Sequence, residues 1–303
     1  MAKIGVVTIT YNSADVLDGF FKSVWAQSHS DFTLYVVDNN SSDNTHALLS
    51  QEGDSRIVRI DNSRNEGVAR ANNQGVQQAL ADGCDYVLLL NNDVEFEETL
   101  FSKLIKGILQ TEASIVTPKM MYYNPSDVIW FGGSFFNKKK GLIPLHRGIR
   151  ERDLGQYDEV EQVEYAPTCC VLIKKEVFEQ VGFMDEKYFV YFDDTDFFYR
   201  VLKTKKHPVF YLPKIRFYHK VGSLTKSNAS SQKKNPIRGD FFLKYNIRNH
   251  NYYLRKHGGL FGYSYIVFLC FKWNLKFVLG RGVRRDWKTF RLINKSYLEG
   301  IFM

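Results

Sequence analysis

Three carboxylates stand within four positions in the run Asp193-Asp194-Thr195-Asp196. Repulsion between such neighbours raises the pKa of at least one of them, and a raised pKa suits a general base that works near neutral pH. The simpler interpretation is a solvated acidic start of a helix, which the helix dipole stabilises. Asp196 and Arg200 have the i,i+4 spacing of an ion pair on that helix.

Further polar clusters follow short apolar runs. Thr10-Tyr11-Asn12 follows Lys3–Ile9, Asp38 to Asp43 follow Thr33–Val37, and Asn91-Asn92-Asp93 follows Tyr86–Leu90. These runs and Ile57–Ile60 predict buried parallel strands, with helices at Ala14–Gln27, Asn44–Gln51 and Gly67–Ala81 between them. Ser42 or Asp43 is expected to cap the second helix. Ligands of doubly wound sheets bind at the carboxyl ends of the strands, where these polar clusters lie.

The second half of the chain is less regular. Strands are predicted at Val128–Phe135, Val163–Ile173 and Pro208–Tyr211, and helices begin near Lys175 and Asp194. Residues 137–160 are predicted to form a mobile surface loop and residues 222–236 a flexible linker. Two or three aromatic helices are expected over Arg238–His257 and Leu260–Met303.

Six motifs occur in a fixed order: VVTITYN, VVDNNSSDNT, NEGVARANNQG, LLLNNDV, YFDDTDFFYR and YHKVGS. This succession over residues 3–225 resembles the family 2 glycosyltransferases of GT-A fold. Within that family, the NND motif, the FDDTD motif and the tail segment Tyr245-Asn246-Ile247-Arg248-Asn249 are together most similar to bacterial rhamnosyltransferases and related galactofuranosyltransferases. The resemblance implies an α/β, Rossmann-like, doubly wound mixed sheet with a C-terminal helical extension. It places a catalytic domain at 1–225 and a basic aromatic region at 237–303.

The resemblance also implies a nucleotide-sugar site. In it, Asp38 accepts a hydrogen bond from a uracil or thymine ring, although a turn at the strand end is its plainer role. Trp130 stacks on a sugar or belongs to the core, and Gly133 lets the backbone approach a sugar closely. The residues expected to bind the donor are Thr10, Tyr11, Asn12, Asp38, Asn65, Gly67, Arg70, Asn72, Asn91, Asn92, Trp130 and Gly133.

A divalent cation, Mn²⁺ or Mg²⁺, is the cofactor that the resemblance implies. Asp93 and His219 are its expected ligands, while Asn91 replaces the first acidic residue of the family's metal motif. One carboxylate with diphosphate oxygens and water can hold such an ion. The alternatives are a helix cap for Asp93 and an ordinary core or surface role for His219.

Inverting transfer needs one base, and the resemblance assigns that role to Asp194. Asp193 is expected to orient hydroxyl groups of the acceptor or donor. The donor is expected to be a UDP- or dTDP-sugar, with rhamnose favoured, and the acceptor a saccharide that is lipid-linked if the tail binds membrane.

Positive charge is concentrated at the C-terminus. Residues 240–303 hold twelve Lys or Arg and three Asp or Glu, whereas residues 1–239 hold 29 and 30. Within Gly259–Gly280, Lys272 and Lys276 leave an apolar run far shorter than the roughly 20 residues of a membrane span. The segment therefore predicts an interfacial helix on an anionic membrane. A helix packed on the catalytic domain or in a homodimer interface is the alternative.

Other classes of protein fit the sequence less well. The N-terminus has no signal-peptide pattern, and the four cysteines form no paired framework. We therefore expect a cytoplasmic protein, peripheral on the inner face of the cell membrane. A nucleic-acid-binding protein fits the basic tail alone, because residues 1–239 are nearly neutral and carry no standard motif. A nucleotidyltransferase would need a Gly-rich, basic phosphate loop directly after the first strand, and this sequence has Thr10-Tyr11-Asn12 there instead. A catalytically dead sugar-binding relative conflicts with the presence of Asp93 and Asp194.

Overall fold

A computed structural model describes residues 2–221 and 239–303 of the chain. The linker predicted at 222–236, with Gly222 and Ser223 of the last motif, lies outside the described residues. Within the described ranges, no helix is both apolar enough and long enough to cross a bilayer.

A mixed sheet runs through the first 221 residues and has ten strands in the described part of the chain. Its order is β10-β12-β6-β11-β4-β1-β2-β3, with β5 beside β12 and β7 beside β6. The strands are β1 (Ile4–Thr10), β2 (Phe32–Asp38), β3 (Ile57–Asp61), β4 (Tyr86–Leu90), β5 (Val94–Phe96), β6 (Ile115–Tyr122), β7 (Ile129–Phe131), β10 (Glu161–Val163), β11 (Cys170–Lys174) and β12 (Val209–His219). The first four are parallel, while β11 runs antiparallel to β4 and β6. The predicted mixed α/β sheet is confirmed.

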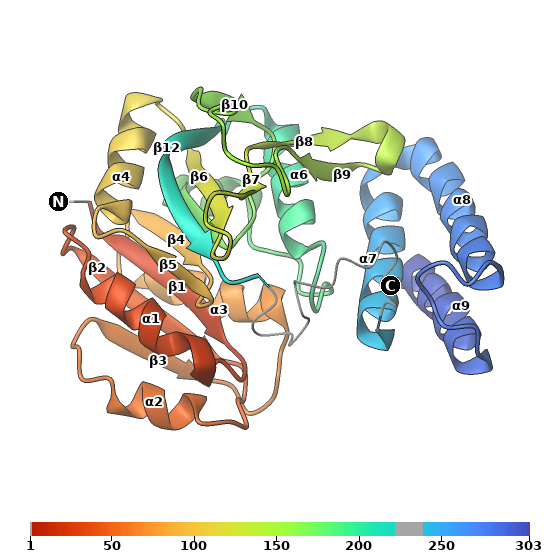
Figure 1. Ribbon diagram of the computed structural model, residues 1–303, viewed down its shortest axis with the longest axis horizontal. Helices are drawn as coiled ribbons and strands as arrows, with labels where there is room; N and C mark the ends of the chain where they lie inside the picture. Colours follow the sequence, from red (N-terminus) through yellow and green to blue (C-terminus); the bar gives the residue numbers. More distant parts are fainter. Residues whose placement is uncertain (1, 222–238) are drawn as a thin grey trace.

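Helices flank this sheet (Figure 1). They are α1 (Ala14–Trp25), α2 (Thr45–Gln51), α3 (Val68–Ala81), α4 (Leu100–Gln110), α5 (Lys175–Val181) and α6 (Asp193–Thr204). Small residues bring α3 close to β1. A Cβ on Gly5 would lie 2.5 Å from that of Ala79, and one on Gly75 would lie 2.4 Å from Val7 Cγ1.

Three helices, α7 (Asp240–His257), α8 (Gly259–Val278) and α9 (Trp287–Phe302), lie beside the sheet on the side away from α1 and α2 (Figure 1). The predicted helical extension is therefore confirmed. Its buried apolar side chains form one cluster with Leu142, Tyr188 and Phe192 of the first region. A separate hairpin of β8 (Ser134–Asn137) and β9 (Ile143–His146) also reaches it. The extension is thus packed on the region that holds the sheet.

Several predicted boundaries were wrong for identifiable reasons. The strand predicted at Val128–Phe135 is divided into β7 and β8, because Gly133 has a φ of 95°. The strand predicted at Val163–Ile173 is likewise two separate strands, β10 and β11. The predicted loop 137–160 contains β9 and a short 3₁₀ turn at Lys138–Lys140.

Strand β6 escaped prediction because Pro118 and Lys119 interrupt its apolar pattern. The Lys119 side chain is fully buried and forms ion pairs with Asp153, at 3.0 Å, and with Asp158. These partners lie more than thirty positions away, and no local pattern indicates them.

Candidate active site

The ends of β1 and β2 hold a buried carboxylate. Thr10 and Asp38 are paired in the register of the two parallel strands, and Thr10 Oγ1 donates to Asp38 Oδ1 at 2.7 Å. The backbone N–H and the hydroxyl of Ser41 also donate to Asp38, at 2.9 and 2.6 Å. Asp38 is 3% exposed and is held as an acceptor at the carboxyl edge of the sheet. A role of Asp38 in binding a nucleotide base stays a prediction.

Asn12 fixes the loop that follows β2. Its backbone is left-handed, with a φ of 53°, and its Oδ1 accepts N–H bonds from Ser42 at 2.8 Å and Asp43 at 3.3 Å. Asp43 in turn accepts from the N–H groups of Ala14 and Thr45, so its side chain supports the first turns of both α1 and α2. Tyr11 remains 48% exposed beside this loop.

The predicted donor residues around α3 contact protein in this structure. Gly67 has a φ of 85°, and a Cβ there would lie 2.4 Å from the carbonyl oxygen of Phe189. Asn65 Oδ1 accepts the N–H of Gly67 at 2.9 Å, and the buried Asn72 side chain lies against Met184. Arg70 is half-exposed. It lies 3.6 Å from Glu66 and 4.0 Å from Glu186. A role of these four residues in donor binding stays a prediction.

Asp93 and His219 are brought together by strand pairing. Position 219 of β12 pairs with position 94 of the antiparallel β5, so His219 Nε2 lies 3.2 Å from Asp93 Oδ1. Both side chains are buried, at 8% and 5% exposed. Asn91 Nδ2 donates to Asp93 Oδ1 at 3.4 Å, and Asn92 Nδ2 donates to the carbonyl oxygen of Ile9 at 2.7 Å.

This donor set fits a divalent cation that also binds substrate. Mn²⁺ binds both a carboxylate oxygen and an imidazole nitrogen, whereas Mg²⁺ prefers oxygen ligands and would bind the carboxylate. The buried Asn92 Oδ1 and His219 Nδ1 have no hydrogen-bond partner in the described structure. Over residues 2–221 and 239–303 no group of three His, Cys, Asp or Glu side chains is arranged to hold an ion. Asp93 and His219 would therefore supply only part of the coordination of such an ion.

A row of rings connects His219 to Tyr165. The Trp130 ring lies edge-on to His219, with centroids 4.9 Å apart, and edge-on to His146 at 5.6 Å. His146 stacks on Tyr165 at 5.5 Å, and burial lowers the pKa of His146 to about 4, so its ring is neutral. Gly133, beside this row, has the positive φ noted above, and a Cβ there would meet the Arg147 guanidinium.

Asp194 lies at the other end of that row. Its Oδ2 accepts a hydrogen bond from the Tyr165 hydroxyl at 2.5 Å, and its Oδ1 accepts the N–H of Thr195 at 2.6 Å. Burial raises the pKa of Asp194, while the Tyr165 hydrogen bond lowers it. Burial and the charge of Asp194 raise the pKa of Asp193 well above its usual value. The expected rise is confirmed, with burial as its main cause.

Asp196 differs from its two neighbours. Burial alone would raise its pKa, but hydrogen bonds from His257 and Lys256 on α7 lower it, as does the bond from Arg200. The Asp196 carboxylate lies 2.7 Å from His257 Nε2, 2.9 Å from Lys256 Nζ and 2.9 Å from Arg200 Nε. The predicted pair with Arg200 is confirmed, and Asp196 is an ionised anchor of α6.

Cys169 stands between the two carboxylate sites. Burial raises the pKa of its thiol well above the usual value, with further contributions from Asp93 and Asp194. Its carbonyl oxygen accepts the N–H of Asn91 at 3.1 Å. Sequence reasoning did not identify Tyr165 or His146, because neither lies in a motif and each acts through a contact between distant segments.

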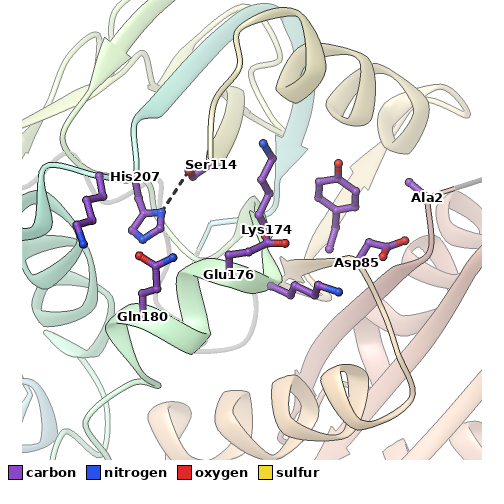
Figure 2. A pocket seen from close by; sticks show the side chains of 10 residues that line it. Ala2, Asp85, Ser114, Lys174, Glu176, Gln180 and His207 are labelled. Carbon is purple, nitrogen blue, oxygen red and sulfur yellow. Dashed lines mark hydrogen bonds between the residues drawn. The ribbon is translucent and has the colours of Figure 1, made fainter.

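A different hollow lies at the amino-terminal end of the strands (Figure 2). It has a volume of about 760 Å³, and its lining includes Asp85, Lys174 and His207. His207 Nδ1 lies 3.3 Å from Ser114 Oγ in this hollow. Lys174 pairs with Tyr86 at the start of β4, the end opposite Asn91. None of the predicted site residues lines it, so we locate the active site at the carboxyl edge.

Comparisons with known proteins identify the family of this chain. The family model for glycosyl transferase family 2 matches residues 5–182. The low-salt glycan biosynthesis hexosyltransferase Agl10 of Haloferax volcanii is 27% identical over 201 residues, which cover 65% of this chain and 61% of that protein. The chain therefore spans about three fifths of this relative. The dTDP-rhamnosyl transferase RfbF of Shigella flexneri is 26% identical over 259 residues, or 84% and 81% of the two chains.

Solved structures share the fold at low identity. A crystal structure of GalNAc-T7 with UDP, GalNAc and Mn²⁺ matches with a TM-score of 0.59 and 14% identity. The match covers 72% of this chain and 44% of that one, and it supports a GT-A arrangement of the sheet and helices.

Proposed function

The chain belongs to glycosyl transferase family 2, and on that premise we propose that it transfers a sugar from a UDP- or dTDP-linked donor to a saccharide, with inversion at the anomeric carbon. The observation that carries the proposal is the placement of Asp93 and His219 at one end of a row of rings, with Asp194 at the other end. Such a site separates the group that stabilises a leaving diphosphate from the group that takes a proton.

Donor recognition would begin at Asp38. Its carboxylate keeps acceptor capacity beyond its bonds to Thr10 and Ser41, and the ring N–H of uracil or thymine is a matching donor. Tyr11 offers an exposed ring beside it for stacking. The similarity to a dTDP-rhamnosyl transferase favours rhamnose as the sugar.

Asp93 and His219 would hold the divalent cation together with the donor diphosphate. When bound, such an ion supplies positive charge that stabilises the departing nucleoside diphosphate. Because this chain offers two ligands from its own side chains, we expect cation and donor to bind cooperatively. Asn91 or Asn92 would then face the ribose or the sugar.

Asp194 would act as the general base. The acceptor hydroxyl attacks the anomeric carbon from the face opposite the diphosphate, its proton passes to Asp194, and the nucleoside diphosphate leaves. A single displacement of this kind inverts the configuration of the sugar. The raised pKa of Asp194 strengthens it as a base, while Tyr165 keeps its ionised form accessible. Asp193, buried beside it, would orient hydroxyl groups.

The tail would hold the enzyme at the inner face of an anionic membrane. One face of α8 packs on the rest of the C-terminal extension through Ile266, Leu269 and Trp273. The opposite face is exposed and apolar: Leu260, Tyr263, Val267, Phe271, Leu275 and Val278 recur on it at helical spacing. Exposed Arg281 and Arg285 follow the helix. Apolar side chains beside basic ones fit anionic lipid, so the acceptor would be a lipid-linked saccharide.

The direct test is release of nucleoside diphosphate by the full chain from a panel of UDP- and dTDP-sugars. Each donor is incubated with a polyprenyl-diphosphate-linked saccharide, with Mn²⁺, with Mg²⁺ or with a chelator. We expect acceptor-dependent release with one or a few donors, and loss of release with the chelator. Release that does not depend on an acceptor, or none with any donor, would contradict the proposal.

A further inference from the structure

Asn249 of α7 binds the segment that leads into α6 through its side-chain amide nitrogen. The residue is 0% exposed. Its Nδ2 donates to the carbonyl oxygens of Val190, at 2.7 Å, and of Tyr191, at 2.9 Å. Its Oδ1 accepts from Arg248 Nε at 2.8 Å, which sets the orientation of the amide. The two N–H bonds therefore hold two consecutive peptide groups in place.

The segment held in this way has an unfavourable backbone. Tyr191 and Phe192 have φ values of 64° and 69°, in the left-handed region that aromatic residues seldom adopt. Such a conformation persists only where the surroundings enforce it. Helix α6 begins at the next residue, Asp193, so the direction of this turn determines where the Asp194 carboxylate lies.

Other contacts from α7 hold the same region. The His250 ring stacks on Phe192 with centroids 5.0 Å apart. Arg248 Nη2 donates to the carbonyl oxygen of Lys187 at 3.0 Å. One turn further along α6, Asp196 is bound by Lys256 and His257 as described above. Helix α7 thus contacts residues on both sides of Asp194 in the sequence.

We propose that Asn249 is a positioning residue for Asp194, so that α7 is part of the catalytic apparatus as well as the base of the C-terminal extension. The assignment rests on the proposed function, because it takes Asp194 as the general base. Asn249 acts through the backbone of Val190 and Tyr191 and has no contact of its own with substrate. In this proposal, the Arg248-Asn249 pair of the tail segment holds the backbone that precedes α6.

Asn251 provides a matched control two positions along the same helix. It is also 0% exposed, but its Nδ2 donates to the carbonyl oxygen of Tyr297 on α9, at 3.4 Å, away from the catalytic segment. The same substitution at both positions puts a carboxylate where an amide donor was. Asn249→Asp also keeps the acceptor for Arg248, so it replaces the two N–H donors by a carboxylate oxygen while the contact with Arg248 remains.

The experiment compares Asn249→Asp and Asn251→Asp in the full chain. Both variants are expected to melt at a lower temperature than the parent protein. Only Asn249→Asp should lower kcat, by about 100-fold, because a base displaced by an ångström loses that much. The KM for the donor should match in the two variants. Amide hydrogen exchange over residues 189–195 should be faster in Asn249→Asp alone.

Each outcome has one meaning. Equal kcat in the two variants, or unchanged exchange over 189–195 in Asn249→Asp, would overturn the positioning role and leave the proposed function intact. Absence of transfer by the parent protein with every donor would remove the function first, and this role with it. If Asn249→Asp does not fold, Asn249→Ala, which buries no charge, is compared with Asn251→Ala against the same outcomes.

Discussion

The Tyr165 hydroxyl donates to Oδ2 of Asp194 across 2.5 Å, and so joins the segment before β11 to the first turn of α6. Burial, with the charge of Asp194, raises the pKa of Tyr165 well above its usual value, so the phenol stays a donor at every working pH. A donor of this kind favours the ionised carboxylate and opposes the effect of burial. Tyr165 therefore adjusts the base without itself being one.

Replacing this hydroxyl should move the pH profile. In Tyr165→Phe the pKa of Asp194 rises further, because burial is no longer opposed by this hydrogen bond. Since the base must be deprotonated, the acidic limb of kcat/KM should shift to higher pH, and activity should be lost earlier as the pH falls. Asp193 and Asp196 on α6, and Cys169 before β11, are among the ionisable groups near Asp194.

Tyr199→Phe is the control for that experiment. Tyr199 contacts Phe136 and Tyr253 through its ring, so the substitution removes a hydroxyl from the same region without touching Asp194. The acidic limb of kcat/KM in Tyr199→Phe should coincide with that of the parent protein. Coincident limbs in Tyr165→Phe as well would contradict the role given to the Tyr165 hydrogen bond.

Asp194→Asn should remove transfer while leaving donor binding in place. A general base contributes roughly 100- to 10,000-fold to the rate, so kcat should fall by about that factor. The side chain keeps its volume and still accepts from Tyr165 through the amide oxygen. Affinity for the nucleoside diphosphate, measured by calorimetry with Mn²⁺, should be unchanged. Full activity in this variant would remove the assignment of Asp194 as the base.

His219→Ala should weaken the metal site. One of the two side-chain ligands is lost, so the Mn²⁺ concentration for half-maximal activity should rise. The advantage of Mn²⁺ over Mg²⁺ should also shrink, because imidazole favours the former. His146→Ala disturbs the same row of rings without removing a ligand and should leave the metal dependence unchanged. An unaltered Mn²⁺ titration in His219→Ala would show that this imidazole binds no metal.

The outer face of α8 should bind anionic vesicles. Val267→Glu with Phe271→Glu places two charges on this exposed face and should abolish flotation with vesicles rich in anionic lipid. Leu109→Glu, at an exposed position of α4, should float as the parent protein does. Equal flotation of the parent protein with neutral vesicles would exclude the electrostatic component. A parent dimer that the double variant abolishes would identify this face as a self-association surface instead.

Much of the fold was predictable because its signals are local. The strands that end at Thr10, Asp38 and Leu90 are continuous apolar runs followed by polar turns, and parallel pairing brings their carboxyl ends to one edge. Asp93 and His219, which the sequence predicts as metal ligands, lie together, while their binding of a metal stays a prediction. These motif residues lie at, or directly after, the end of the strand that positions them.

The parts that were not predictable depend on contacts between distant segments. Tyr165 reaches Asp194 across 29 positions, and Asn249 reaches Tyr191 across 58. The left-handed turn at Tyr191 and Phe192 has no glycine to indicate it. Periodicity and capping describe a helix and its ends, but they carry no information on which buried amide will hold a turn elsewhere in the chain.

The most direct test of the central claim is the melting temperature of the parent protein and of Asp93→Asn with UDP or dTDP, each with and without Mn²⁺. A ligand that binds only the folded state raises the melting temperature by mass action. We predict a shift in the parent protein with one of these nucleotides that requires Mn²⁺ and is lost in Asp93→Asn. No shift with either nucleotide, or an equal shift in Asp93→Asn, would contradict a metal-assisted nucleotide-sugar site at the carboxyl edge of the sheet.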